Sequence, residues 1–178
     1  MLSALLFLAE AAIAFFCVLF LLRFAMQLLR VSFVGPLGQF VASLTRWAVL
    51  PLRRIVPGWF GLDLASLLAA FLLQMAFTGL VYALTAGPVA PAPLDLLLLL
   101  LKSAGIGLLR LSIHLLIGVL IVQAVLSWVN PHSPLAVPAN QLSRPFLAPI
   151  RRFLPLLGGI DLSPLIVILL AQAVLMLL

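Results

Sequence analysis

The segment LASLLAAFLLQMAFTGLVYAL, residues 64–84, decides the fold class, because it is predominantly apolar and contains no charged residue. A helix needs about 20 apolar residues to cross the hydrocarbon layer of a bilayer, which is roughly 30 Å thick. Three other segments are also predominantly apolar, although the first two of them contain charged residues: 5–29, 106–129 and 162–178. The sequence therefore predicts an all-α membrane protein with about four transmembrane helices.

Composition supports this fold class. The chain has 178 residues, of which 66% are hydrophobic and only 8% are charged, whereas a soluble domain devotes about a quarter of its residues to charge. Cys17 lies inside the first apolar segment and has no second cysteine to pair with, so we interpret it as a small hydrophobic residue. We expect the first segment to remain as a membrane anchor, because no basic stretch of the kind found in signal peptides precedes it.

The distribution of arginines predicts the orientation. Five arginines lie within residues 23–54 and three within 144–152, whereas segment 85–93 contains no basic residue. Because basic connections are retained on the cytoplasmic side of a membrane, we predict that both arginine-rich connections face the cytoplasm. Both termini then lie outside.

The chain repeats itself at an offset of 98 residues. Pro51-Leu-Arg-Arg-Ile-Val-Pro57 recurs as Pro149-Ile-Arg-Arg-Phe-Leu-Pro155, and each copy is followed by a glycine and an aspartate. Twelve of the positions in residues 44–74 are identical in the second copy. Leucines alone would match by chance in so biased a chain, but prolines, arginines and aspartates in register would not.

This duplication predicts two units of the same orientation, each made of a helix, an amphipathic segment and a second helix. The first unit is 1–85 and the second is 94–178, with a proline- and alanine-rich turn at 86–93. Leu94 to Leu101 is too short to span alone, and it either lengthens the third helix or lies at the interface.

The connection inside each unit is too apolar for a solvated loop, and we expect an amphipathic helix in the headgroup layer. In residues 37–50, Gln39, Ser43 and Arg46 share one helical face. We expect the prolines of both connections, at positions 51, 57, 145, 149 and 155, to interrupt the helix near the paired arginines.

The repeated Pro-x-Arg-Arg-x-x-Pro motif, with its following Gly and Asp, resembles the duplicated signature of the YggT family of bacterial membrane proteins. Gly159-Ile-Asp-Leu-Ser-Pro164 and Leu126-Ser-Trp-Val129 resemble it as well, and the resemblance covers nearly the whole chain. It implies a location in the bacterial inner membrane and a link with osmotic-stress resistance and ion homeostasis. It also implies proximity to cell-division genes and, for plastid relatives, roles in thylakoid protein assembly or nucleoid arrangement. It implies no catalytic residue.

The basic clusters are candidate binding sites for anionic phospholipids or a membrane-protein partner, because guanidinium groups bind phosphate oxygens bidentately. The alternative is that they only set topology. We predict that the two Arg-Arg pairs meet as one clamp at the cytoplasmic face, and we expect no nucleic acid contact. The candidate residues are Arg46, Arg53, Arg54, Arg144, Arg151 and Arg152.

Asp63 and Asp161 each precede an apolar segment, where a carboxylate caps the next helix, pairs with the upstream arginines, or does both. Glu10 and Arg110 are expected at similar depth in the membrane. We predict a contact between them, with snorkelling of Arg110 to the interface as the alternative.

The remaining polar residues of the apolar segments are Gln74, His114 and Gln172. We expect His114 to make a hydrogen bond between helices, with a role in proton or ion movement as the alternative.

No motif for catalysis, metal or cofactor binding is present, and the protein is expected to be non-enzymatic. Two functions compete. The first is a scaffold or assembly factor at the cytoplasmic face, and the second is a small transporter or channel component in ion or osmolyte homeostasis. Because four short spans bury little lateral surface, a homo-oligomer is also expected.

Overall fold

The computed structural model describes residues 2–56, 62–85, 92–152 and 161–178. Within these ranges the regular secondary structure consists of six helices. They are α1 (Leu2–Leu28), α2 (Pro36–Ile55), α3 (Leu64–Thr85), α4 (Pro93–Val129), α5 (Ala136–Arg151) and α6 (Ser163–Leu177).

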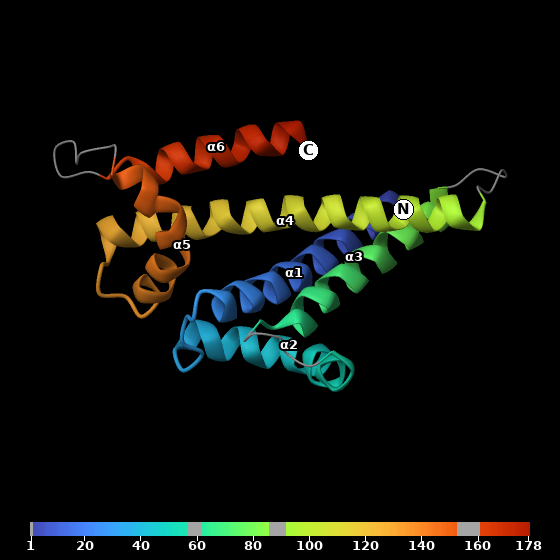
Figure 1. Cartoon of the computed structure of the whole chain (residues 1–178), viewed down its shortest axis with the longest axis horizontal. Helices are drawn as coiled ribbons and strands as arrows, with labels where there is room; N and C mark the ends of the chain where they lie inside the picture. Colours follow the sequence, from blue (N-terminus) through green and yellow to red (C-terminus); the bar gives the residue numbers. More distant parts are fainter. Residues whose placement is uncertain (1, 57–61, 86–91, 153–160) are drawn as a thin grey trace.

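Three long helices form the centre of the molecule. Helices α1 and α3 pack side by side, and α4 packs against both of them (Figure 1). Helix α6 lies along α4, away from α1 and α3, while the shorter α2 and α5 lie at the ends of the long helices.

The expected membrane-spanning character is confirmed for three helices: α1, α3 and α4 are long and apolar enough to cross a bilayer. Helix α6 is apolar but has only 15 residues. The leucine stretch 94–101 extends α4, so it is not a separate interfacial segment. The resulting helix has 37 residues and is about 55 Å long, so it extends beyond a hydrocarbon layer of roughly 30 Å.

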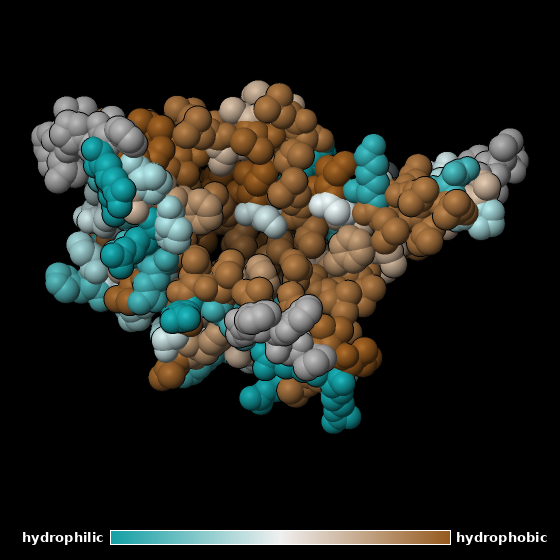
Figure 2. Space-filling model, in the orientation of Figure 1, coloured by the Kyte–Doolittle hydropathy of each residue, from teal (hydrophilic) through white to brown (hydrophobic). Residues whose placement is uncertain are grey.

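Hydrophobic and hydrophilic side chains are distributed over the surface as in a membrane protein. Hydrophobic side chains cover the middle of the face shown in Figure 2, and hydrophilic side chains gather at its margins, over α5 and along α2. Phe7, Leu94 and Met176 are 68%, 66% and 89% exposed. Lipid chains can cover such side chains, whereas water cannot do so favourably.

The expectation that prolines interrupt the connecting helices is wrong for the described residues. Helix α2 continues through Pro51, and α5 continues through Pro145 and Pro149. Each proline removes one backbone donor, but all three lie on exposed faces, where water and lipid headgroups can bind the freed carbonyl. Pro57 and Pro155, together with residues 86–91 of the predicted turn, lie outside the described residues.

Candidate functional site

Asp63, immediately before α3, is the centre of a buried ion-pair network. Asp63 is only 2% exposed. Arg23 Nε donates to Asp63 Oδ2 at 3.0 Å, and Arg53 donates through Nη2 to Oδ2 at 2.9 Å and through Nε to Oδ1 at 3.3 Å. The Ser66 hydroxyl donates to Oδ2 at 2.7 Å. One carboxylate therefore receives hydrogen bonds from two arginines and a serine.

Arg23 connects this carboxylate to helix α2. Its side chain is 13% exposed, and its Nη1 donates to Thr45 Oγ1 at 2.7 Å. The Thr45 hydroxyl in turn donates to the Val41 carbonyl at 2.6 Å. Arg53 Nη2 also contacts Gln27 Oε1 at 3.4 Å. Side chains of α1, α2 and α3 are thus joined at one buried point.

The electrostatics of the network keep Asp63 ionised. Burial disfavours the carboxylate, but hydrogen bonds from Arg53, Ser66 and Arg23 outweigh that effect, so the pKa of Asp63 lies below its ordinary value. At neutral pH one carboxylate is paired with two guanidinium groups. The network therefore carries one net positive charge.

The corresponding aspartate of the second half, Asp161, makes a simpler site. Arg151 Nε donates to Asp161 Oδ2 at 2.8 Å, and the Ser163 backbone N–H donates to Oδ1 at 2.9 Å. Arg151 Nη2 lies 2.6 Å from the same Oδ2 in an ion pair. The residue 98 positions after Arg23 is Ile121, so the second arginine is missing here. The Asp161 carboxylate thus binds an arginine and a backbone N–H of the first turn of α6, whereas the Asp63 carboxylate binds the first turn of α3 through the Ser66 hydroxyl.

The exposure of the two aspartates differs. The Asp161 side chain is 22% exposed and that of Asp63 is 1% exposed. Burial opposes ionisation of Asp161 as well, and hydrogen bonds from Ser163 and Arg151 lower its pKa below the ordinary value. Solvent weakens a charge pair of this kind, so the second site contributes less to stability than the first.

The six candidate arginines divide into two groups. Arg53 and Arg151 are held by aspartates. The others are exposed, and their side chains make no ion pair or hydrogen bond with a described residue: Arg46, Arg54, Arg144 and Arg152.

The prediction of one joint clamp is wrong. Figure 1 shows the end of α2 and the end of α5 at different margins of the molecule. Arg53 and Arg54 lie in the last turn of α2, and Arg151 is the last residue of α5. The chain therefore carries two separate basic corners.

Polar residues of the apolar helices meet at a second place. Glu10, Gln74 and Arg110 line one cavity of about 240 Å³ between α1, α3 and α4. Glu10 and Arg110 share this cavity but form no ion pair within 4.0 Å, so the predicted direct contact is wrong.

The other polar residues predicted inside the membrane are scattered. His114 is exposed, and its Nδ1 lies 2.8 Å from the Arg110 carbonyl of the same helix, so the bond between helices that we expected for it is not formed. Gln172 is exposed on α6. The described part of the chain contains no group of three His, Cys, Asp or Glu residues suited to a metal.

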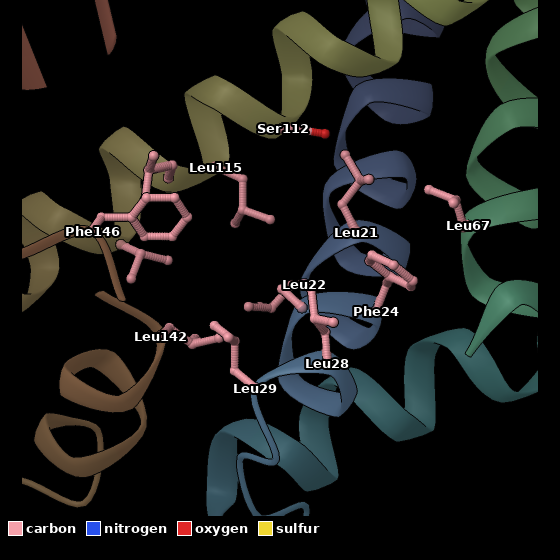
Figure 3. Close-up of a pocket in the computed structure, with 13 residues that line it drawn as sticks. Leu21, Leu22, Phe24, Leu28, Leu29, Leu67, Ser112, Leu115, Leu142 and Phe146 are labelled. Carbon is pink, nitrogen blue, oxygen red and sulfur yellow. The ribbon is translucent and has the colours of Figure 1, made fainter. Parts of the chain in front are cut away.

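A second cavity, of about 250 Å³, lies between α1, α4 and α5 and is lined mainly by leucines, with Phe24 and Phe146 among the other apolar residues (Figure 3). Ser112 is the only residue with a polar side chain in its lining, and its hydroxyl donates to the Leu108 carbonyl of its own helix at 2.8 Å. This cavity therefore accommodates apolar groups only.

The sequence profile described as CCB3/YggT matches residues 2–84 and 103–178. The chain belongs to the CCB3/YggT family. It is 37% identical over 174 residues to the protein YggT of Escherichia coli strain K12, covering 97% of this chain and 87% of YggT. It is also similar to the protein PA0392 of Pseudomonas aeruginosa, at 36% identity over 165 residues, 92% of this chain and 82% of the relative. No solved structure matches the chain.

Two residues of this CCB3/YggT protein were missed by sequence reasoning: Arg23 and Thr45. Arg23 reads as one of the basic residues at the end of the first span, although it stands among apolar residues. A charge among apolar residues needs a partner, and Asp63 is the nearest carboxylate after it in the sequence. The charge of Arg23 among apolar residues therefore pointed to Asp63. It did not point to Thr45, because a threonine on a buried helical face is only weakly polar.

Proposed function

We propose that this CCB3/YggT protein is a non-enzymatic scaffold or assembly factor of the bacterial inner membrane, which binds anionic phospholipids at its cytoplasmic face. The observation that carries the proposal is the division of the arginines. In each half one arginine is held by an aspartate, while its neighbour in the sequence, Arg54 or Arg152, is exposed without a partner among the described residues.

The surroundings of the exposed arginines suit a lipid headgroup layer. Helix α2 exposes Trp47 and Leu50 at 64% and 54%, on the same short helix as Arg46 and Arg54. Helices that combine exposed basic and apolar side chains lie at the membrane interface. Each basic residue near an anionic leaflet adds about 1 kcal/mol of binding free energy.

The paired arginines have a different role in this proposal. Arg53 and Arg151 fasten the ends of the amphipathic helices to the start of the following helix, which holds the neighbouring arginines in a defined place.

The two basic corners face the cytoplasm, and both termini lie outside. The two halves are copies of one unit, and two corners at different margins gather lipid around the protein. This arrangement fits an assembly or stress factor, in agreement with the link to osmotic stress that the family resemblance implies.

The lipid-binding proposal predicts a difference between arginine and lysine. Replacing Arg46, Arg54, Arg144 and Arg152 together by lysine keeps the positive charge, so membrane insertion should be normal. Lysine lacks the planar fork that holds two phosphate oxygens at once. Retention of cardiolipin and phosphatidylglycerol, measured by native mass spectrometry, should fall several-fold. This corresponds to a total loss of about 1 kcal/mol in the free energy of lipid binding.

The matched control is Lys102→Arg, a change in the N-terminal part of α4, which should leave lipid retention as it is. Unchanged retention in the fourfold lysine variant would reduce these arginines to determinants of topology.

A further inference from the structure

The cavity between α1, α3 and α4 brings together two charges of opposite sign. Glu10 comes from α1 and Arg110 from α4, while Gln74 and Phe77 come from α3. These three helices pack against one another in pairs (Figure 1). With a volume of about 240 Å³, the cavity equals the liquid volume of about eight water molecules.

The cavity lies well away from the Arg23–Asp63 end of α1 and α3. Gln74 is ten residues beyond Leu64, the first residue of α3, and Glu10 is thirteen residues from Arg23 along α1. At 1.5 Å per residue these separations are about 15 Å and about 20 Å. Because the hydrocarbon layer is roughly 30 Å thick, the cavity lies near its middle if the Arg23–Asp63 pair marks the cytoplasmic boundary.

Both charges lack a partner of their own. Neither Glu10 nor Arg110 has a side-chain hydrogen bond or an ion pair with a described residue. Both residues are exposed at the opening of the cavity, and an unpaired charge among the apolar residues of a membrane helix commonly marks a substrate or ion site. The two charges are too far apart for an ion pair, yet they line the same space.

The amide of Gln74 has room in the cavity because α4 has a glycine opposite it. A Cβ atom at Gly107 would lie 2.6 Å from Gln74 Nε2. Any larger residue at position 107 would displace the amide. On its other side Gln74 Oε1 is 4.0 Å from the Cys17 thiol, so the amide is held between α1 and α4.

We propose that this cavity binds a small zwitterion of the amino acid type, with a carboxylate and an ammonium group separated by a few carbon atoms. Arg110 binds the carboxylate through its planar fork, and Glu10 binds the ammonium group. Phe77, which also lines the cavity, supplies an aromatic ring of the kind that attracts a cation, and Gln74 adds a polar contact. The ligand neutralises both charges at once, which neither an anion nor a cation does.

The position of the cavity is that of a transport site. Substrate sites of transporters built from repeats lie near the middle of the bilayer, where the repeats meet. Here α1 and α3 come from residues 1–85, whereas α4 (Pro93–Val129) lies in residues 94–178 except for its first residue. A zwitterion site goes beyond the lipid scaffold proposed above and is independent of the cytoplasmic arginines.

The test uses the full chain in lipid nanodiscs and a panel of zwitterions: glycine, L-alanine, β-alanine, γ-aminobutyrate and glycine betaine. At millimolar concentration at least one of them should raise the thermal unfolding midpoint saturably, while acetate and methylammonium should not. Glu10→Gln and Arg110→Gln should each weaken binding of that ligand about 10-fold to 100-fold. Lys102→Gln, on the same helix but outside the cavity, should leave binding unchanged.

Three results would overturn the proposal: no response to any zwitterion, an equal response to acetate, or binding that survives the loss of both charges. A Glu10–Arg110 pair bridged only by water would give destabilised single variants and no response to the panel. If a charge variant does not fold, Gly107→Ala supplies the test, because it displaces the Gln74 amide and keeps every charge. It should also weaken binding, and wild-type affinity in a folded Gly107→Ala protein would contradict the placement of Gln74.

Discussion

Asp63→Asn should lower the free energy of unfolding by about 3–5 kcal/mol, because removing one member of a buried charge network leaves the others without compensation. The asparagine has nearly the same shape, but it leaves Arg23 and Arg53 without a counter-charge. Arg23 is the more affected of the two, since its side chain is only 13% exposed. Unfolding of the detergent-solubilised protein, followed by circular dichroism during titration with a denaturing detergent, measures the loss.

Asp161→Asn is the matched control for this prediction. It removes the aspartate of the second half, which has one arginine partner and a side chain exposed at 22%, so the loss should be at most about 1 kcal/mol. Equal losses in the two variants would contradict the central role of the Asp63 network.

The Asp63 network should also make the stability of the wild-type protein fall at acidic pH. The pKa of Asp63 is lowered in the folded state, whereas in the unfolded chain it is about 3.9. The ionised carboxylate therefore stabilises the fold above about pH 4, and this contribution is lost as the pH falls through the lowered folded-state pKa. The Asp63→Asn variant should lack this part of the acid dependence.

Gly38→Ala should destabilise the first half by about 1–3 kcal/mol, because overpacking at a rigid contact forces the backbone to move. A Cβ atom at position 38 would lie 2.4 Å from Phe33 Cα and 2.7 Å from the Phe33 carbonyl carbon and oxygen. These are backbone atoms and cannot rotate away as the end of a side chain does. The thermal unfolding midpoint of the variant measures the effect.

Gly35→Ala is the control for Gly38. A Cβ atom at Gly35 would meet nothing within 4 Å, and the backbone there is extended, with φ of −71°. The change should alter stability by less than about 0.5 kcal/mol. The position equivalent to Gly38 in the second half is Ala136. A Gly38→Ala protein as stable as the Gly35→Ala protein would contradict the close approach of Phe33.

Hydropathy predicted the helical fold and the main spans well, because the length of a membrane helix follows from the thickness of the bilayer. The ends of the helices were predicted less well. Proline normally ends a helix, yet α2 and α5 continue through theirs. Each of these prolines faces outward, and the sequence shows this only when the buried face is known.

The partners of charged residues were predicted in part. A pairing of Asp63 with Arg53 was among the predictions, because the two lie ten residues apart around a connection. Arg23 lies 40 residues before Asp63, and nothing local joins them. Glu10 and Arg110 were predicted at similar depth and do line one cavity. The distance between their side chains depends on how α1, α3 and α4 pack, and this packing cannot be predicted from a local sequence pattern.

We expect the aspartate-paired arginines to hold the fold and the exposed arginines to bind lipid. Native mass spectrometry of two double variants separates these roles, with Arg54→Gln/Arg152→Gln compared against Arg53→Gln/Arg151→Gln. The first variant should lose bound cardiolipin and phosphatidylglycerol while its unfolding is unchanged, and the second should be destabilised but keep more of its lipid. Full lipid retention by Arg54→Gln/Arg152→Gln, or equal lipid loss from both variants, would show that the exposed arginines do not bind lipid in this way.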